Sequence, residues 1–72
     1  MSKNKIKNRI LELLKEQDWP VTTEQVANKL EISWNTAQVH LLKLSTEGIV
    51  KYKKVGRQNQ FWLNKKYKEE FD

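Results

Sequence analysis

Residues 33–50, with the sequence SWNTAQVHLLKLSTEGIV, combine side chains suited to recognising a ligand through hydrogen bonds. Three apolar residues recur at helical spacing and predict the buried side of a helix: Ala37, Leu41 and Leu44. On the opposite face we expect Asn35, Gln38 and Lys43. Amides both donate and accept hydrogen bonds, and an ammonium group donates them and carries positive charge. Because few carboxylates neutralise this face, it is suited to a polar ligand with acceptor groups or negative charge.

The sequence holds no set of residues typical of catalysis or metal binding. His40 is the only histidine, the chain has no cysteine, and Glu47 lies seven residues from His40 with no other acid beside it. Glycine-rich phosphate loops, nucleophile motifs and paired carboxylates are also missing from the sequence. We therefore expect a protein that is not an enzyme and that binds no metal and no cofactor.

Size and composition indicate one small domain with a thin core. A chain of 72 residues buries only about 60% of its unfolded surface, and without cysteine no disulfide can stabilise it. No apolar run approaches the ~20 residues of a membrane span. The basic N-terminus lacks the apolar middle of a signal peptide. These features predict a cytoplasmic protein with no membrane partner.

Positive charge is concentrated towards the two ends of the chain. Residues 1–9 hold four basic residues and no acid, residues 10–48 hold three basic and six acidic residues, and residues 49–68 hold seven basic residues and no acid. The formal net charge is +5 and the pI is about 9.6. This distribution favours a surface that binds a polyanion. The alternative is a lysine-rich surface that is only solvated.

Two helices are predicted before residue 33. A stripe of apolar residues at helical spacing predicts a helix from Lys3 to Gln17. The helix must end there, because the residue before Pro20 is disfavoured in the helical conformation. Thr22 or Thr23 then starts a second helix, which ends near Glu31.

Short polar side chains are placed to cap the second and third helices. Thr22 and Gln25 fit a capping box, in which each side chain accepts from a free backbone N–H group of the first turn. Ser33 can accept in the same way, so the third helix is predicted from Trp34 to about Glu47. Gly48 is the expected left-handed stop.

After the third helix the apolar spacing changes from helical to alternating. Residues 49–55 and 58–63 are rich in β-branched and aromatic side chains. They predict the two strands of a hairpin, with Gly56-Arg57 at a basic tip. Glycine suits this tip because a tight turn needs a residue with positive φ.

The expected fold class is mainly α with a small β-hairpin (α+β). The predicted order is helix, short strand, helix, helix, strand, strand over residues 1–63, with Val21 supplying the short extended pairing. Residues 64–72 form a charged tail that can include a short helix.

The stretch from 22 to 50 resembles the helix-turn-helix of small prokaryotic transcription regulators, bacterial and archaeal, of the arsenic-repressor and multiple-antibiotic-resistance types. The shared elements are a small polar cap, a His-Leu pair and a Gly-apolar-Val ending: Ser33, His40-Leu41 and Gly48-Ile49-Val50. The hairpin VKYKKVGRQNQFWL resembles the wing of those proteins. The resemblance covers roughly residues 6–63 and implies a winged helix-turn-helix. Metal sensing is not implied, since the sensing members use cysteines.

The resemblance implies a DNA site with two parts. Helix three would enter the major groove and the wing would contact the backbone or the minor groove. Base contacts are expected from the first turns of helix three: Trp34, Asn35, Thr36, Gln38 and Val39. An Asn or Gln amide can pair with adenine. Many such regulators have arginine in place of Val39. Backbone contacts are expected from Ser33, Lys43 and the wing cations Lys51, Lys53, Lys54 and Arg57.

The expected function is that of a DNA-binding protein and transcription regulator, with double-stranded DNA as its partner. The alternative is a winged helix used as a protein–protein interaction module or as a non-specific nucleic-acid clamp. A protein partner is favoured if Val39 and Leu42 face outward beside Trp34, because the exposed face of helix three is then more apolar than DNA reading requires. A weak homodimer would double the DNA site. Apolar residues are available for it in the tail and on the first helix: Tyr67, Phe71 and Leu11.

Overall fold

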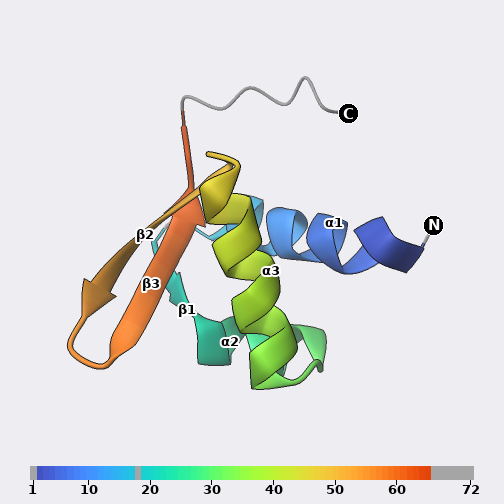
Figure 1. The fold of residues 1–72 in the computed structure, drawn as a ribbon, viewed down its shortest axis with the longest axis horizontal. Helices are drawn as coiled ribbons and strands as arrows, with labels where there is room; N and C mark the ends of the chain where they lie inside the picture. Colours follow the sequence, from blue (N-terminus) through green and yellow to red (C-terminus); the bar gives the residue numbers. More distant parts are fainter. Residues whose placement is uncertain (1, 18, 66–72) are drawn as a thin grey trace.

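The computed structural model describes residues 2–17 and 19–65, with side chains from residue 5 onward (Figure 1). Over these residues it contains three helices and three strands. In chain order they are α1 (Ser2–Glu16), β1 (Val21–Thr22), α2 (Thr23–Leu30), α3 (Trp34–Thr46), β2 (Val50–Val55) and β3 (Gln58–Leu63). This confirms the predicted fold class and the predicted order of elements. The tail beyond residue 65, with its predicted short helix, lies outside the described residues.

The three strands form one antiparallel sheet in the order β1-β3-β2. Strands β2 and β3 pair over their whole length, from Val50 opposite Leu63 to Val55 opposite Gln58. The short strand β1 adds to the other edge of β3 and confirms the pairing predicted for Val21. In Figure 1, the hairpin of β2 and β3 runs beside α3, and its turn lies at the edge of the molecule.

The hairpin turn contains only Gly56 and Arg57, and Gly56 has φ +64°. Arg57 does not have a positive φ. A two-residue loop with glycine in the first central position matches a type II′ turn, whose twist suits antiparallel strands. The predicted role of Gly56 is therefore confirmed, and the turn presents Arg57 at the end of the hairpin.

Side-chain caps fix the start of both helices that border the hairpin. Thr22 accepts from the backbone N–H of Gln25 at 3.2 Å, and the Gln25 side chain accepts from the backbone N–H of Thr22 at 2.9 Å. This confirms the capping box and, of the two predicted starts, makes Thr22 the cap and Thr23 the first helical residue. Ser33 caps α3 by accepting from the backbone N–H of Thr36 at 3.1 Å.

Helices α2 and α3 are each followed by a residue in the left-handed conformation, but the residue type differs. Gly48 has φ +82° after α3, and the N–H groups of Gly48 and Ile49 donate back to the carbonyls of Ser45 and Leu44. This is the paired C-terminal motif that glycine favours. After α2 the left-handed position is occupied by Glu31, with φ 58°. A side chain at such a position is strained by its Cβ atom.

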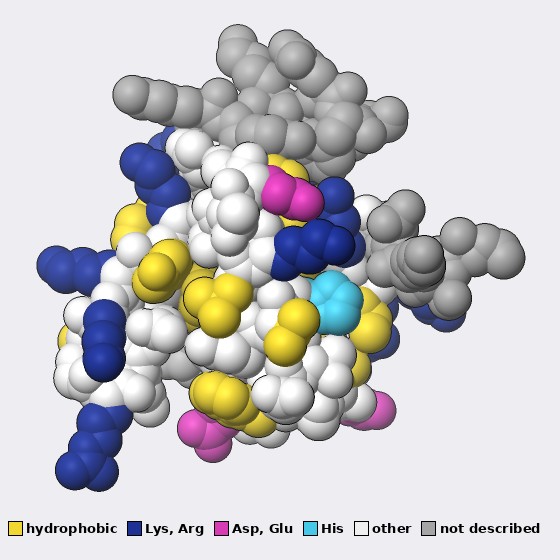
Figure 2. Space-filling view, viewed as in Figure 1, with side chains coloured by type: hydrophobic (Ala, Val, Ile, Leu, Met, Phe, Trp, Pro, Cys, Tyr) yellow, Lys and Arg dark blue, Asp and Glu magenta, His cyan; other side chains and the backbone are white. Residues whose placement is uncertain are grey.

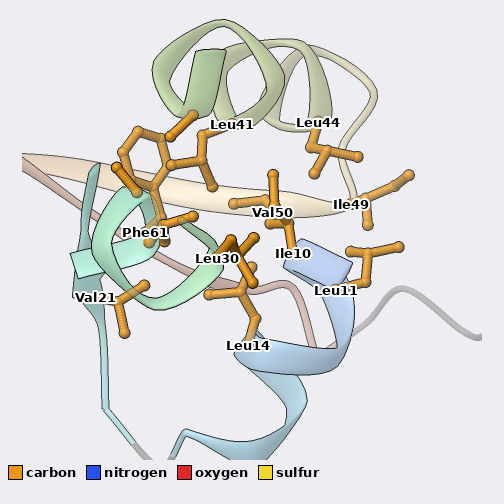
Figure 3. Packing of buried hydrophobic residues seen from close by; sticks show 13 residues of the cluster. Ile10, Leu11, Leu14, Val21, Leu30, Leu41, Leu44, Ile49, Val50 and Phe61 are labelled. Atoms are coloured by element: carbon orange, nitrogen blue, oxygen red, sulfur yellow. The ribbon is translucent and has the colours of Figure 1, made fainter. Parts of the chain in front are cut away.

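The core lies between the three helices and one face of the sheet (Figure 3). Side chains from α1, α3 and β3 meet there, and Phe61 is its largest fully buried member. The predicted interior of α3 is confirmed, since Ala37 and Leu41 are 0% exposed and Leu44 is 2% exposed. Asn64 links the end of β3 to the segment that follows α3. Its backbone N–H donates to the carbonyl oxygen of Ile49, and its side-chain amide donates to the carbonyl oxygen of Gly48.

The prediction that Leu11 is available for a dimer surface is wrong. Leu11 is only 3% exposed and belongs to the core with Ile10 and Leu14 (Figure 3). The physical reason is that α1 packs against three elements, α2, α3 and β3. The buried part of its circumference is therefore wider than the single apolar stripe seen in the sequence. The other predicted dimer residues, Tyr67 and Phe71, lie outside the described residues.

Candidate nucleic-acid interface

A concave surface lies between α3 and the hairpin and is open to solvent. Its volume is about 570 Å³. One side is formed by α3, with Trp34, Gln38 and Leu42 at successive turns, and the start of α2 borders it near Thr23. The hairpin closes the other side. We call this surface the α3–wing groove.

The outermost side of α3 carries Asn35 and Val39. Asn35 is exposed, and its amide makes no hydrogen bond within the described residues. Val39 is 54% exposed and Trp34 is also 54% exposed. In Figure 2, apolar side chains are spread along the middle of the view, where α3 faces the reader. The first turns of α3 therefore present one free amide between apolar side chains.

The apolar spacing predicted Gln38 on the face of α3 opposite the core, and this prediction is wrong. It is half-buried, and its Oε1 atom accepts a hydrogen bond from the Thr23 hydroxyl at 2.6 Å. The reason is the close packing of α2 against α3, which covers the flank of the helix on which Gln38 stands. The Gln38 side chain borders the α3–wing groove but is anchored at one end.

Ser33 and Thr36 act together in the helix cap. The Ser33 hydroxyl donates to the Thr36 hydroxyl at 2.8 Å and accepts from the Thr36 backbone N–H. Thr36 also has its carbonyl oxygen 2.9 Å from Nδ1 of His40, which donates to it. These bonds hold the first turn of α3 in place, and with it the exposed side chain of Asn35.

The hairpin has two faces, and its cations are divided between them. Val50 and Phe61 are buried, and side chains alternate along a strand. Tyr52 and Lys54 therefore lie on the same side of the sheet as α3. The Tyr52 ring confirms this direction, because its centroid is 5.6 Å from that of Phe61.

Lys54 and Arg57 line the α3–wing groove, and both are exposed. Lys51 and Lys53 occupy the alternate positions, opposite Trp62 and Gln60 on the far face of the sheet. The structure thus brings two of the four predicted wing cations together with α3 and turns the other two away. Lys43 is exposed in the last turn of α3.

A family model described as FaeA-like protein matches residues 6–63 of the chain. The chain belongs to the FaeA-like family. This is a winged-helix-like family of small regulators, in agreement with the winged-helix fold of the described residues. A search of curated proteins and a search of solved structures each found no match.

Sequence reasoning missed several groove residues of this FaeA-like protein. Tyr52 and Asn59 line the groove from the hairpin, and the alternation from buried Val50 and Phe61 was a signal that could have found them. Glu24 and Thr23 border it from the start of α2. No sequence pattern points to these two residues, because their position depends on how α2 packs against α3.

Across residues 2–17 and 19–65, no three His, Cys, Asp or Glu side chains gather where a metal ion could be held. Within the same ranges, none of the helices combines the length and apolar character needed to cross a membrane. The groove itself is lined by amides, hydroxyls, aromatic rings, two cations and the carboxylate of Glu24.

Proposed function

We propose that this FaeA-like protein is a DNA-binding transcription regulator of the cytoplasm, with α3 in the major groove and the hairpin tip on the backbone or in the minor groove. The observation that carries the proposal is the arrangement of the α3–wing groove. A helix with no acid in its first turn faces two cations of the hairpin, Lys54 and Arg57.

The major groove of B-DNA is wide enough for one α-helix. In our proposal Asn35 contacts base edges, because it is exposed and its amide is free to pair. Val39 and Trp34 stand beside it and can contact the methyl group of thymine. Ser33 is the N-cap of α3 and Lys43 lies in its last turn, and in our proposal both contact phosphates.

The hairpin supplies a second contact. Phosphate contacts position a protein on the duplex without selecting a sequence. Lys54 fits that role. Arg57 stands at the narrow tip and fits either a phosphate or a minor groove over an A·T tract, where the negative potential is strongest. The sequence likeness of residues 22–50 to arsenic-repressor and multiple-antibiotic-resistance regulators supports the same mode of binding.

The experiment is a binding selection from random duplex DNA at two salt concentrations, followed by affinity measurements on the enriched and random sequences. Asn35→Ala should reduce the preference for the enriched site by about 1–3 kcal/mol while the domain stays folded. Asn8→Ala makes the same change on α1, away from the groove, and should leave the preference unchanged. Equal preference ratios for wild type and Asn35→Ala would rule out base reading by Asn35.

One observation favours a second candidate function. Trp34, Val39 and Leu42 are 54%, 54% and 37% exposed along α3, which is more apolar surface than hydrogen-bonded readout requires. Such exposed apolar groups also suit a protein partner. A folded wild-type chain that shows no affinity for duplex DNA even at low salt would favour this protein–protein module over the regulator proposed above.

A further inference from the structure

The hydrogen bond between Thr23 and Gln38 gives the Gln38 amide a direction. Thr23 is the first residue of α2 and only 4% exposed. Its hydroxyl donates to Oε1 of Gln38 at 2.6 Å, a short bond between residues fifteen positions apart. The oxygen of the amide therefore points towards the junction of α2 and α3, where the buried hydroxyl lies.

The nitrogen of the same amide is left for the groove. Within the described residues Gln38 makes no other hydrogen bond, and among those residues no buried side-chain nitrogen or oxygen lacks a partner. The Nε2 atom of Gln38 is thus not buried. Since Gln38 lines the α3–wing groove, its two N–H groups are available there as donors.

We propose that Gln38 acts as a hydrogen-bond donor that selects a base with a keto oxygen, guanine or thymine, and that Thr23 is the positioning residue that enforces this choice. The proposal rests on the DNA-binding function proposed above. It replaces the adenine pairing expected from the residue type alone.

The edges of the bases in the major groove explain the selectivity. Adenine is bound by a Gln amide that presents its oxygen and its nitrogen together, the oxygen to the amino group and the nitrogen to N7. Here the oxygen is turned to Thr23. Guanine offers two acceptors, O6 and N7, and thymine offers the acceptor O4. Cytosine offers the donor of Gln38 only an amino group. Adenine offers N7, but its neighbouring amino group lacks the amide oxygen that would accept from it, so both bases are disfavoured relative to guanine and thymine.

The test is a binding selection with wild type and with variants at positions 23 and 38. Gln38→Ala identifies the base pair whose preference depends on Gln38. At that position wild type should enrich guanine or thymine over adenine by about five- to 150-fold. Thr23→Val keeps the shape of the residue and removes the hydroxyl, so the amide is free to turn. In Thr23→Val the enrichment of guanine or thymine over adenine should therefore fall towards one-fold.

Two controls separate positioning from folding. Thr23→Ser keeps the hydroxyl and should restore the wild-type preference. Thr46→Val removes a hydroxyl from the far end of α3, where it donates to the Leu42 carbonyl, and should change no base preference. If Thr23→Val fails to fold, as judged by its thermal melt, Thr23→Ala provides a second chain without the hydroxyl.

Three outcomes would overturn the inference. Enrichment of adenine or cytosine at the Gln38-dependent position would show that Gln38 does not act as a donor, while the proposed function would stand. If Thr23→Val and Thr23→Ala keep the wild-type preference for guanine or thymine over adenine, Thr23 does not position the Gln38 amide. If wild type enriches no sequence at all, the proposed function fails and this inference falls with it.

Discussion

The guanidinium of Arg9 in α1 donates from Nη2 to the backbone carbonyl oxygen of Leu30, the last residue of α2, at 3.1 Å. The last carbonyls of a helix have no partner within the helix, and a cation there also interacts favourably with the helix dipole. Nearby on α1, Lys7 forms an ion pair with Glu47 at 4.0 Å. Arg9 and Lys7 therefore have partners within the fold, so these two cations near the N-terminus are not simply part of an open surface for binding a polyanion.

Arg9→Gln should destabilise the domain without weakening DNA binding. The bond that this change removes joins a charged donor to a partly buried carbonyl, so we expect a loss of about 1 kcal/mol in the free energy of unfolding. Urea denaturation measures this loss as a lower midpoint with an unchanged slope. Lys5→Gln removes a cation from an exposed position on the same helix and should leave the midpoint unchanged. A matching loss of stability in both variants would show that net charge, and not the bond to Leu30, is responsible.

Neutralising the two groove-facing cations of the hairpin should weaken DNA binding. In Lys54→Gln/Arg57→Gln, affinity for the selected site and for random DNA should fall by similar factors. The slope of log K against log salt should become shallower by about 0.9 for each phosphate that the variant no longer neutralises. Titrations at several salt concentrations measure both quantities.

The matched control for the hairpin is Lys51→Gln/Lys53→Gln, which removes the same charge from the far face of the sheet. It should affect affinity and salt slope much less. If the two double variants behave alike, the hairpin acts through its total charge and the division between its faces has no consequence. If Arg57 enters a minor groove, its removal should weaken binding more with A·T-rich than with G·C-rich flanks.

Glu24→Gln should strengthen DNA binding. Glu24 is exposed and is the acidic residue among those that line the α3–wing groove, where it would repel a phosphate. Removal of this charge should raise the affinity for selected and random DNA alike, and most at low salt, where screening is weakest. Glu12→Gln, on the exposed side of α1, provides the control with the same charge change. An affinity gain no larger than that of Glu12→Gln would show that Glu24 does not face the DNA.

Glu31→Gly should stabilise the domain. The left-handed backbone at Glu31 costs about 1–2 kcal/mol for a side chain with a Cβ atom, whereas glycine adds about 0.4–1 kcal/mol of unfolded-state entropy. The net gain in unfolding free energy is therefore between about 0 and about 1.6 kcal/mol, measured by urea denaturation. Gly48→Ala is the converse variant, with a positive φ and no atom within 4 Å of the added Cβ. It should lose about 1 kcal/mol, and a gain there would contradict the argument.

Local sequence patterns determined the elements of this protein. Helical spacing of Ala37, Leu41 and Leu44 predicted α3, and caps at Thr22 and Ser33 predicted where α2 and α3 begin. The alternation after residue 49 predicted the hairpin. Each of these features depends on neighbours within a few positions of the chain, so the residue types alone contain the information.

Tertiary packing decided which side chains form the candidate interface. Leu11 lies beside the apolar stripe of its helix and Gln38 is polar, so both were expected at the surface. Packing nevertheless buries Leu11, and Thr23 from another helix anchors Gln38. The division of the wing cations follows from the choice of which hairpin face packs on α3. These outcomes depend on contacts between residues far apart in the chain. A single sequence therefore specifies the α-helices and the hairpin, while the direction of a particular amide or lysine is set only when those elements pack together.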